Sequence, residues 1–266
     1  MTKIIAEIGW NHMGDMKLAK EMIKAAKDSG ADFAKFQTWS VDRLKPGPWN
    51  EDGRIDIYKK AELTRENHEE LISYCNEVEI EFMSSVFSIA DAQLLVDLGI
   101  KTVKIPSMEC RNTELVKFCN ENFESIYMST GASTLKEVCD SVDLIDKPLF
   151  LMHCVSSYPC KIENANLNKI FGLKGICPTV GYSDHCLGTD VAKYAIEYGI
   201  HVIEKHFTTD TSLPGRDNQF AITPPELKNL RNWIDNKTLA QQYVARDYLP
   251  VEEEVRNIYH GRFNNE

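Results

Sequence analysis

The chain has 266 residues, of which 43% are hydrophobic, and a formal net charge of −10 at pH 7. This length suits one large domain or two small ones, and the hydrophobic content can supply a sizeable core. The negative charge argues against nucleic acid or an anionic membrane as the main partner, so an anionic substrate would require positive charge concentrated at one place.

The sequence carries no pattern typical of secretion or membrane insertion. Residues Met1–Glu7 lead directly into a strand-like apolar segment, which differs from a signal peptide. No apolar stretch approaches the length of a transmembrane helix. The eight cysteines include no Cys-x-x-Cys pair and are expected to be reduced thiols. We therefore expect a cytoplasmic protein.

Short apolar segments rich in β-branched residues alternate with helical patterns along the chain. Several of these segments are continuously hydrophobic, which is typical of strands buried on both faces of a parallel sheet. In chain order the predicted strands are Ile4–Ile8, Phe33–Gln37, Ile80–Ser84, Thr102–Ile105, Ser125–Ser129, Leu149–Cys154, Thr179–Tyr182 and His201–Lys205.

Helical periodicity fills the intervals between these strands. The predicted helices are Met16–Lys27, Arg65–Glu77, Ile89–Leu98, Asn112–Asn120, Leu135–Ile145, Asn166–Leu173, Asp190–Tyr198 and Pro225–Trp233. Glycines such as Gly30 and Gly99 follow several of them and are natural C-terminal caps. Strands that alternate with helices eight times predict an α/β fold of the (β/α)8 TIM-barrel type. A doubly wound sheet is the alternative, but no Gly-x-Gly-x-x-Gly motif follows any strand.

The predicted barrel occupies residues 1–240, because no linker precedes Asn236. Residues 241–266 are polar and charged, and they are expected to form a C-terminal extension without a domain of its own. The segment Thr38–Leu63 is long for a strand-to-helix connection, and Lys45-Pro46-Gly47-Pro48-Trp49 excludes regular structure there. It is either a lid over a binding site or a surface insertion.

Polar residues gather at the carboxyl ends of the predicted strands, where barrels of this type carry their active sites. Side chains alternate between faces along a strand, so residues two positions apart point the same way. Pairs of this kind are Lys35 with Gln37, Ser183 with His185, and Glu204 with His206. Buried charges are costly unless they are neutralised. The charged residues at strand ends are therefore expected to neutralise one another, a metal ion and an anionic ligand; they are Glu7, Lys35, Lys104, Glu109 and Glu204.

Two histidines, His185 and His206, follow apolar segments and lie 21 positions apart (206 − 185). On adjacent parallel strands their imidazoles would emerge at the same rim and suit a divalent cation with open coordination positions. A structural role for both is the alternative. His153 is expected to be a core histidine with its hydrogen bonds satisfied.

Other motifs are open to more than one interpretation. Ser129-Thr130-Gly131 is compatible with a plain strand-to-helix turn. A lysine on a barrel strand is also typical of Schiff-base aldolases, for which Lys104 and Lys205 are the candidates. A non-catalytic barrel that binds a sugar is a further alternative for the function of the chain.

A series of short motifs, in order from residue 6 to about residue 217, resembles the sialic acid synthase family. The motifs are Ala6-Glu7-Ile8-Gly9-x-Asn11-His12-x-Gly14, Lys35-Phe36-Gln37-Thr38, Lys104-Ile105-Pro106-Ser107-x-Glu109, Ser129-Thr130-Gly131, His153-Cys154-x-Ser156-x-Tyr158-Pro159, Gly181-Tyr182-Ser183-Asp184-His185 and Ile203-Glu204-Lys205-His206-Phe207-Thr208. Each motif alone is weak, but together they are specific.

The resemblance implies a (β/α)8 barrel that condenses phosphoenolpyruvate with the open aldehyde of an N-acetylated amino sugar, such as N-acetylmannosamine, to give a nonulosonic acid and phosphate. It implies a divalent ion, Mn²⁺ or Mg²⁺, held at His185 and His206 to activate the aldehyde. Glu109 matches the carboxylate that takes a proton from the attacking water, and Glu7 is a second acid–base candidate.

The resemblance also assigns binding residues by motif position. The phosphoenolpyruvate-binding set is Lys35, Ser85, Lys104, Ser107, Ser129, Ser156 and Ser183. The sugar-binding set is Gln37, Tyr158 and Asp217, to which we add Arg216.

Three features depart from the family pattern. Trp10 stands where a smaller residue is usual, and Arg216 stands where proline is expected. Family members carry a small C-terminal domain resembling an antifreeze protein, which reaches across a dimer and supplies an arginine to the N-acetyl group of the sugar. We expect the 266 residues to include no such domain and the sugar pocket to be completed differently, with Arg216 or the segment Thr38–Leu63 as the candidates. A homodimer is compatible with the sequence but not required by it.

Overall fold

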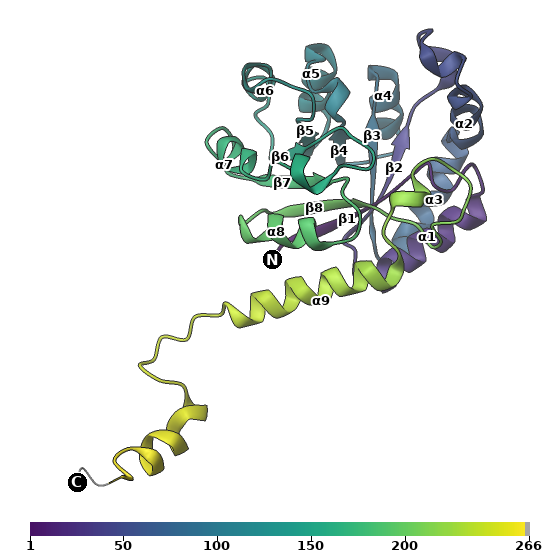
Figure 1. The fold of residues 1–266 in the computed structure, drawn as a ribbon. Helices are drawn as coiled ribbons and strands as arrows, with labels where there is room; N and C mark the ends of the chain where they lie inside the picture. Colours follow the sequence, from purple (N-terminus) through teal and green to yellow (C-terminus); the bar gives the residue numbers. More distant parts are fainter. Residues whose placement is uncertain (264–266) are drawn as a thin grey trace.

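A closed barrel of eight parallel strands forms the centre of the computed structural model, which describes residues 1–263 (Figure 1). The strands follow one another around the barrel in chain order, and the last pairs with the first. Their bounds are Lys3–Gly9 (β1), Phe33–Thr38 (β2), Glu81–Val86 (β3), Thr102–Ile105 (β4), Ser125–Ser129 (β5), Leu149–Cys154 (β6), Val180–Asp184 (β7) and Val202–His206 (β8). The predicted (β/α)8 fold is confirmed, and each predicted strand lies within two residues of an observed one.

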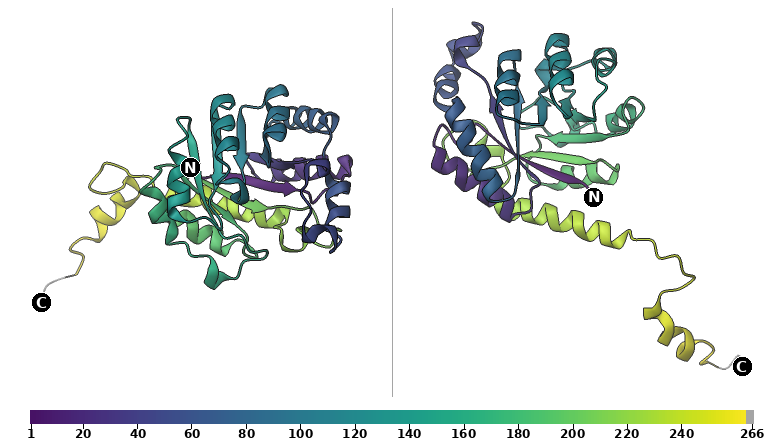
Figure 2. Two further views of the ribbon diagram at one scale, coloured as in Figure 1. Left: turned by 90° about the horizontal axis from the view of Figure 1, so that it is seen from above. Right: turned by 180° about the vertical axis from the view of Figure 1, so that it is seen from behind.

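The helices lie outside the barrel, and most of them cover its strands (Figures 1 and 2). Their bounds are Met16–Asp28 (α1), Arg54–Ala61 (α2), Arg65–Glu77 (α3), Ile89–Asp97 (α4), Thr113–Asn122 (α5), Leu135–Val142 (α6), Lys169–Lys174 (α7), Asp190–Glu197 (α8) and Pro224–Ala240 (α9). Gly30, Gly99 and Gly199 follow α1, α4 and α8 with φ of 93°, 77° and 68°, a left-handed conformation that favours glycine after a helix.

Two helices, α2 and α9, differ most from the sequence-based expectation. Helix α2 lies within Thr38–Leu63 and was not predicted, because its sequence lacks a clear apolar stripe. A 3₁₀ turn at Pro48–Asn50 also falls where regular structure was excluded; proline at its first position supplies a helical φ. Helix α9 continues to Ala240, beyond the predicted end at Trp233, and packs against α1 and α8.

The hydrophobic core has two parts. The larger part lies between the sheet and the helices. The smaller part fills the barrel interior; it consists of Ile5, Phe33, Met83, Tyr127, Met152 and Val202. These six side chains block the lumen, as in other barrels of this type, and they form the apolar floor on which the polar residues above them rest.

After α9 the chain leads away from the barrel (Figures 1 and 2). Residues 241–263 contain a 3₁₀ turn at Pro250–Glu252 and a π-helical turn at Val255–Tyr259. The division into a barrel at residues 1–240 and an extension at residues 241–266 stays a prediction, and its last three residues lie outside the described part. Among residues 1–263, no helix combines the length and apolar character needed to cross a membrane.

Candidate active site

A cavity of about 780 Å³ opens at the carboxyl ends of the strands. Most barrel strands contribute to its wall. The segment Thr38–Leu63 borders it as well, with Trp39, Trp49, Arg54 and Tyr58 among the lining residues. This segment is therefore part of the binding cavity and not a remote surface insertion.

The polar wall of the cavity follows from strand periodicity. Each residue of the apolar floor is followed two positions later by a side chain that points into the same lumen, one layer higher. The pairs, floor residue first, are Ile5 with Glu7, Phe33 with Lys35, Met83 with Ser85, Tyr127 with Ser129, Met152 with Cys154, and Val202 with Glu204. Along each strand, the side chains that face the barrel interior thus change from apolar to polar or charged within two residues.

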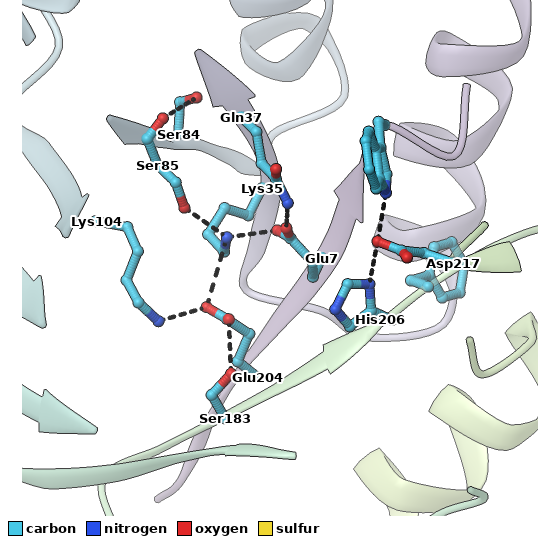
Figure 3. Close-up of polar contacts among 12 residues, drawn as sticks. Glu7, Lys35, Gln37, Ser84, Ser85, Lys104, Ser183, Glu204, His206 and Asp217 are labelled. Atoms are coloured by element: carbon cyan, nitrogen blue, oxygen red, sulfur yellow. Dashed lines mark hydrogen bonds and ion pairs between the residues drawn. The ribbon is translucent and has the colours of Figure 1, made fainter. Parts of the chain in front are cut away.

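Four buried charged residues form a connected network directly above this floor (Figure 3). Lys35 Nζ lies 2.5 Å from Glu7 Oε2 and 3.8 Å from Glu204 Oε2. Lys104 Nζ lies 2.8 Å from the same Glu204 oxygen. Ser183 donates to Glu204 Oε1 at 2.9 Å. Four of the five charged residues at strand ends thus contact one another, whereas the fifth, Glu109, accepts a hydrogen bond from Asn112 and lies outside this network.

The two carboxyl groups differ in acidity. Burial raises the pKa of Glu7, and the attraction of Lys35 only partly offsets this, so the pKa stays above its usual value. Burial acts on Glu204 in the same direction, but Lys104 and Lys35 outweigh it and lower the pKa of Glu204 to about 2. Glu204 is therefore the firmly ionised member of the pair, and Glu7 is the one better suited to hold a proton.

The two lysines differ as well. Burial lowers the pKa of Lys104, and the nearby carboxylate of Glu204 does not fully restore it. Burial also acts against the charge of Lys35, but the carboxylates of Glu204 and Glu7 together raise its pKa above the usual value. Lys35 is a permanent cation at neutral pH, and Lys104 is held less firmly in its charged form.

His185 and His206 lie side by side at the rim, with ring centroids 5.5 Å apart. The Nδ1 of His185 is within 2.8 Å of the Val155 carbonyl oxygen, which leaves its Nε2 available. The Nδ1 of His206 finds no hydrogen-bond partner within residues 1–263 and lies 3.6 Å from Asp217 Oδ2. Burial, reinforced by His185, keeps the pKa of His206 well below its usual value, so this imidazole is neutral, as metal ligation requires.

The metal-binding prediction has a limit in the geometry. Within residues 1–263, no group of three or more histidine, cysteine, aspartate or glutamate side chains is arranged around a common metal position. Burial acts against a charge on His185, but its contact with Cys154 raises its pKa above the usual value, so this imidazole must lose its proton before it can bind a cation. The two imidazoles fit a cation that takes its remaining ligands from water and substrate. The donor set fits a loosely held catalytic ion better than a closed structural one.

Asp217 connects the histidines to the long segment. The Trp10 indole nitrogen donates to Asp217 Oδ2, and the Trp10 ring stacks on Tyr58 of α2 at 5.1 Å. Burial raises the pKa of Asp217 to about 6, although the Trp10 hydrogen bond acts in the opposite direction. Trp10 thus holds both a cavity carboxylate and one helix of the Thr38–Leu63 segment.

The structure brings together nearly all the residues proposed for the site. Those that line the cavity are Glu7, Lys35, Gln37, Ser85, Lys104, Ser107, Glu109, Ser129, Tyr158, Ser183, His185, His206, Arg216 and Asp217. Ser156 lies just outside the lining, beside Gly131, whose missing β-carbon leaves room for Ser156 Oγ and Ser107 Oγ. Lys205 points to the opposite face of β8 and pairs with Asp184, so it does not reach the cavity.

Sequence reasoning missed several cavity residues. The strand-end position of Glu204 predicts a charge on the same face as His206, but not its contacts with Lys104, Lys35 and Ser183. Trp10 was noted only as a departure from the family pattern, yet it binds Asp217. Trp39 and Tyr58 carried no usable signal, because their approach to the cavity depends on how the long segment folds back.

Comparison with known proteins identifies the family of the chain. The sequence profile described as the NeuB family matches residues 22–245. The chain belongs to the NeuB family. This NeuB-family chain is 40% identical over 278 residues to the N,N'-diacetyllegionaminic acid synthase of Legionella pneumophila, with 95% of this chain and 78% of that protein covered. It is 36% identical to the synthase of the same name from Campylobacter jejuni, with 86% and 74% covered.

A solved structure is similar over nearly the whole length. The N-acetylneuraminic acid synthetase of Leptospira borgpetersenii serovar Hardjo-bovis superposes with a TM-score of 0.87 at 29% identity, and the match covers 99% of this chain and 93% of that one. The NeuB-family barrel is therefore shared with synthases of acidic sugars, and the chain is an enzyme of the transferase class.

Proposed function

We propose that this NeuB-family enzyme condenses phosphoenolpyruvate with the open-chain aldehyde of an N-acetylated amino sugar, such as N-acetylmannosamine, to give a nonulosonic acid and phosphate. The observation that carries the proposal is the buried network of two lysines and two glutamates beside a histidine pair in one cavity. The relatives named as legionaminic acid synthases support an N-acetylated sugar partner.

Lys35 and Lys104 are the groups suited to bind the carboxylate and phosphate of phosphoenolpyruvate. Their side chains are 3% and 2% exposed, so a charge that reaches them is shielded from water. Hydroxyl donors surround them; they are Ser85, Ser107, Ser129 and Ser183, with Ser156 beside Gly131. The ionised Glu204 neutralises part of this positive charge until the substrate arrives, and Glu7, which contacts Lys35, is the carboxyl group better suited to hold a proton.

We also propose that His185 and His206 hold a divalent cation, Mn²⁺ or Mg²⁺. When bound, the cation supplies Lewis-acid polarisation of the sugar aldehyde. Nδ1 of the buried His206 has no hydrogen-bond partner within the described residues 1–263, which supports this assignment because a buried polar atom without a partner is costly. Gln37, Tyr158, Arg216 and Asp217 line the same cavity as the histidines and are the groups proposed to contact the sugar. Tyr158 lies against His185, with ring centroids 4.1 Å apart.

The proposed chemistry assigns a proton task to each carboxylate. The C3 carbon of phosphoenolpyruvate bonds to the aldehyde carbon, and the electron pair moves to the aldehyde oxygen, which takes a proton from Glu7. Water then adds to C2 and gives a proton to Glu109, whose Oε2 accepts a hydrogen bond from Asn112 at 2.8 Å. In the tetrahedral intermediate the bond between C2 and the phosphate oxygen then breaks, the hydroxyl proton passes to the departing phosphate, and C2 becomes the ketone.

A second candidate function rests on Lys104 alone. A lysine with a lowered pKa on a barrel strand suits a Schiff-base aldolase. Lys205, the other candidate, is paired with Asp184 outside the cavity. Reduction with borohydride in the presence of a keto acid distinguishes the two functions, because only the aldolase would form a covalent adduct at Lys104.

The decisive experiment measures phosphate released from phosphoenolpyruvate. We expect release that requires both Mn²⁺ and an N-acetylated amino sugar, from a panel that includes N-acetylmannosamine and diacetamido sugars. The Glu109→Gln variant serves as the inactive control. No release with any sugar, in the presence of intact folding, would contradict the proposal and favour a barrel that binds sugars without catalysis.

A further inference from the structure

A second ion pair lies directly behind the two histidines, on the outer face of the strands. Asp184 and Lys205 are register partners on β7 and β8, and Lys205 Nζ lies 3.0 Å from Asp184 Oδ2. Their side chains are 0% and 2% exposed. Because side chains alternate along a strand, Asp184 and Lys205 point away from the cavity and do not line it. Their neighbours His185 and His206 point into it.

The pair holds the chain on both sides of His185. Asp184 Oδ1 accepts hydrogen bonds from the Cys186 amide at 2.9 Å and from the Tyr182 hydroxyl at 3.1 Å. The bond to residue 186 closes an Asx turn whose central residue is His185. Lys205 Nζ also donates to the Cys186 carbonyl at 2.6 Å. The backbone of His185 is therefore fixed by the residue before it and the residue after it.

The same ammonium group joins the two histidine segments. The ammonium group of Lys205 contacts Asp184 and Cys186, which flank His185. Lys205 itself directly precedes His206, so one side chain links the segments that carry the two imidazoles. A buried ion pair contributes little net stability compared with well-packed apolar side chains. The directional contacts of the Lys205 ammonium group with Asp184 and Cys186 could not be reproduced by a pair of apolar side chains at these positions.

We propose that the Asp184–Lys205 ion pair is a positioning device that sets the spacing and orientation of His185 and His206 for a divalent cation. This inference rests on the proposed function, because it presumes that the histidines bind a metal. Groups behind metal ligands commonly change metal affinity by about 10–100-fold when they are removed, and the same range is expected here.

The test uses Mn²⁺ binding to the full chain without substrates, measured by electron paramagnetic resonance of the free ion. The Asp184→Asn/Lys205→Met double variant removes both charges at once, so no lone charge is left buried. We expect its Kd for Mn²⁺ to rise by about 10–100-fold, while circular dichroism shows an intact fold. In activity assays, the Mn²⁺ concentration that gives the half-maximal rate should rise in the double variant. The factor of this rise should be larger than the factor by which kcat falls at saturating Mn²⁺.

A matched control separates positioning from general destabilisation. Arg231 forms ion pairs with Asp235 at 2.9 Å and Asp32 at 3.5 Å, at the amino-terminal end of the strands. The Arg231→Met variant should lower the Tm and leave the Kd for Mn²⁺ unchanged. A wild-type Kd in the folded double variant would overturn the inference.

Two further results keep the test decisive. If the double variant does not fold, Tyr182→Phe removes only the hydroxyl bond to Asp184; a small rise in the Kd supports the inference and an unchanged Kd overturns it. If wild type binds Mn²⁺ no better than His185→Ala/His206→Ala, the proposed metal site fails. This result would contradict the proposed metal site itself. If instead wild type binds Mn²⁺ at the histidines and the double variant binds it equally well, only the inference about the ion pair fails.

Discussion

Replacement of Glu204 by glutamine probes the buried charge network most directly. Glu204 accepts contacts from Lys104, Lys35 and Ser183, and its pKa is lowered from 4.5 to about 2 in the folded chain. A shift of this size corresponds to about 3 kcal/mol of stability at neutral pH. For a domain of this length, a loss of about 3 kcal/mol lowers the Tm by roughly 6–12 °C.

The pH dependence gives the sign of the effect. Because the folded pKa of Glu204 lies below the unfolded value, its contribution is complete above pH 4.5 and is lost as the pH falls towards about 2. The Glu204→Gln variant should therefore lose stability mainly at neutral pH, and its Tm should approach that of wild type in acid. Differential scanning calorimetry across this pH range measures both.

A double-mutant cycle supplies the refutation. Lys104→Met combined with Glu204→Gln should be less destabilised than the sum of the single variants, because each single variant leaves a buried charge without its partner. Glu197→Gln is the surface control, since its pair with Lys237 at 3.4 Å is half exposed and such pairs contribute about 0–1 kcal/mol. The reasoning would be refuted if the destabilisation of the double variant equalled the sum for the two single variants. It would also be refuted if Glu204→Gln changed the Tm no more than Glu197→Gln does.

Three further predictions concern catalysis. Trp10→Phe keeps the ring on Tyr58 but removes the donor to Asp217, so steady-state kinetics should show a raised KM for the sugar and an unchanged KM for phosphoenolpyruvate. Glu109→Gln should lower kcat by about 10²–10⁴-fold, with phosphoenolpyruvate binding retained in isothermal titration calorimetry. Treatment with EDTA should abolish phosphate release, and added Mn²⁺ should restore it in wild type but not in His206→Ala.

Each of these predictions has an outcome that contradicts it. Equal changes in both KM values for Trp10→Phe would show that the indole does not act on the sugar side. Wild-type kcat in Glu109→Gln would remove this carboxylate from the proton transfer. Full activity after EDTA treatment, with metal absent by elemental analysis, would rule out the proposed cation.

The sequence predicted the barrel well because its strands are short, apolar and evenly separated by helices. Helix ends were less accurate: α9 continues to Ala240, since packing against α1 and α8 stabilises turns that the local pattern did not indicate. Helix α2 was missed because it packs at the rim of the cavity and carries no continuous apolar stripe.

The candidate site was predictable where it depended on strand alternation. That rule placed Lys35 with Gln37 and Glu204 with His206 on shared faces. It could not show which charges pair, because the Lys104–Glu204 contact joins residues 100 positions apart across the barrel lumen. Nor could it show the contact of Trp10 with Asp217, which exists only after the barrel has closed through β1 and β8.

The apolar floor has a consequence for changing the specificity of this enzyme. Its six residues and the polar residues above them belong to the same strands, two positions apart, so an insertion or register slip in a strand would disturb packing and chemistry together. The Thr38–Leu63 segment carries aromatic side chains to the cavity without contributing to the floor. Libraries aimed at new sugars should therefore vary this segment and leave the strands intact.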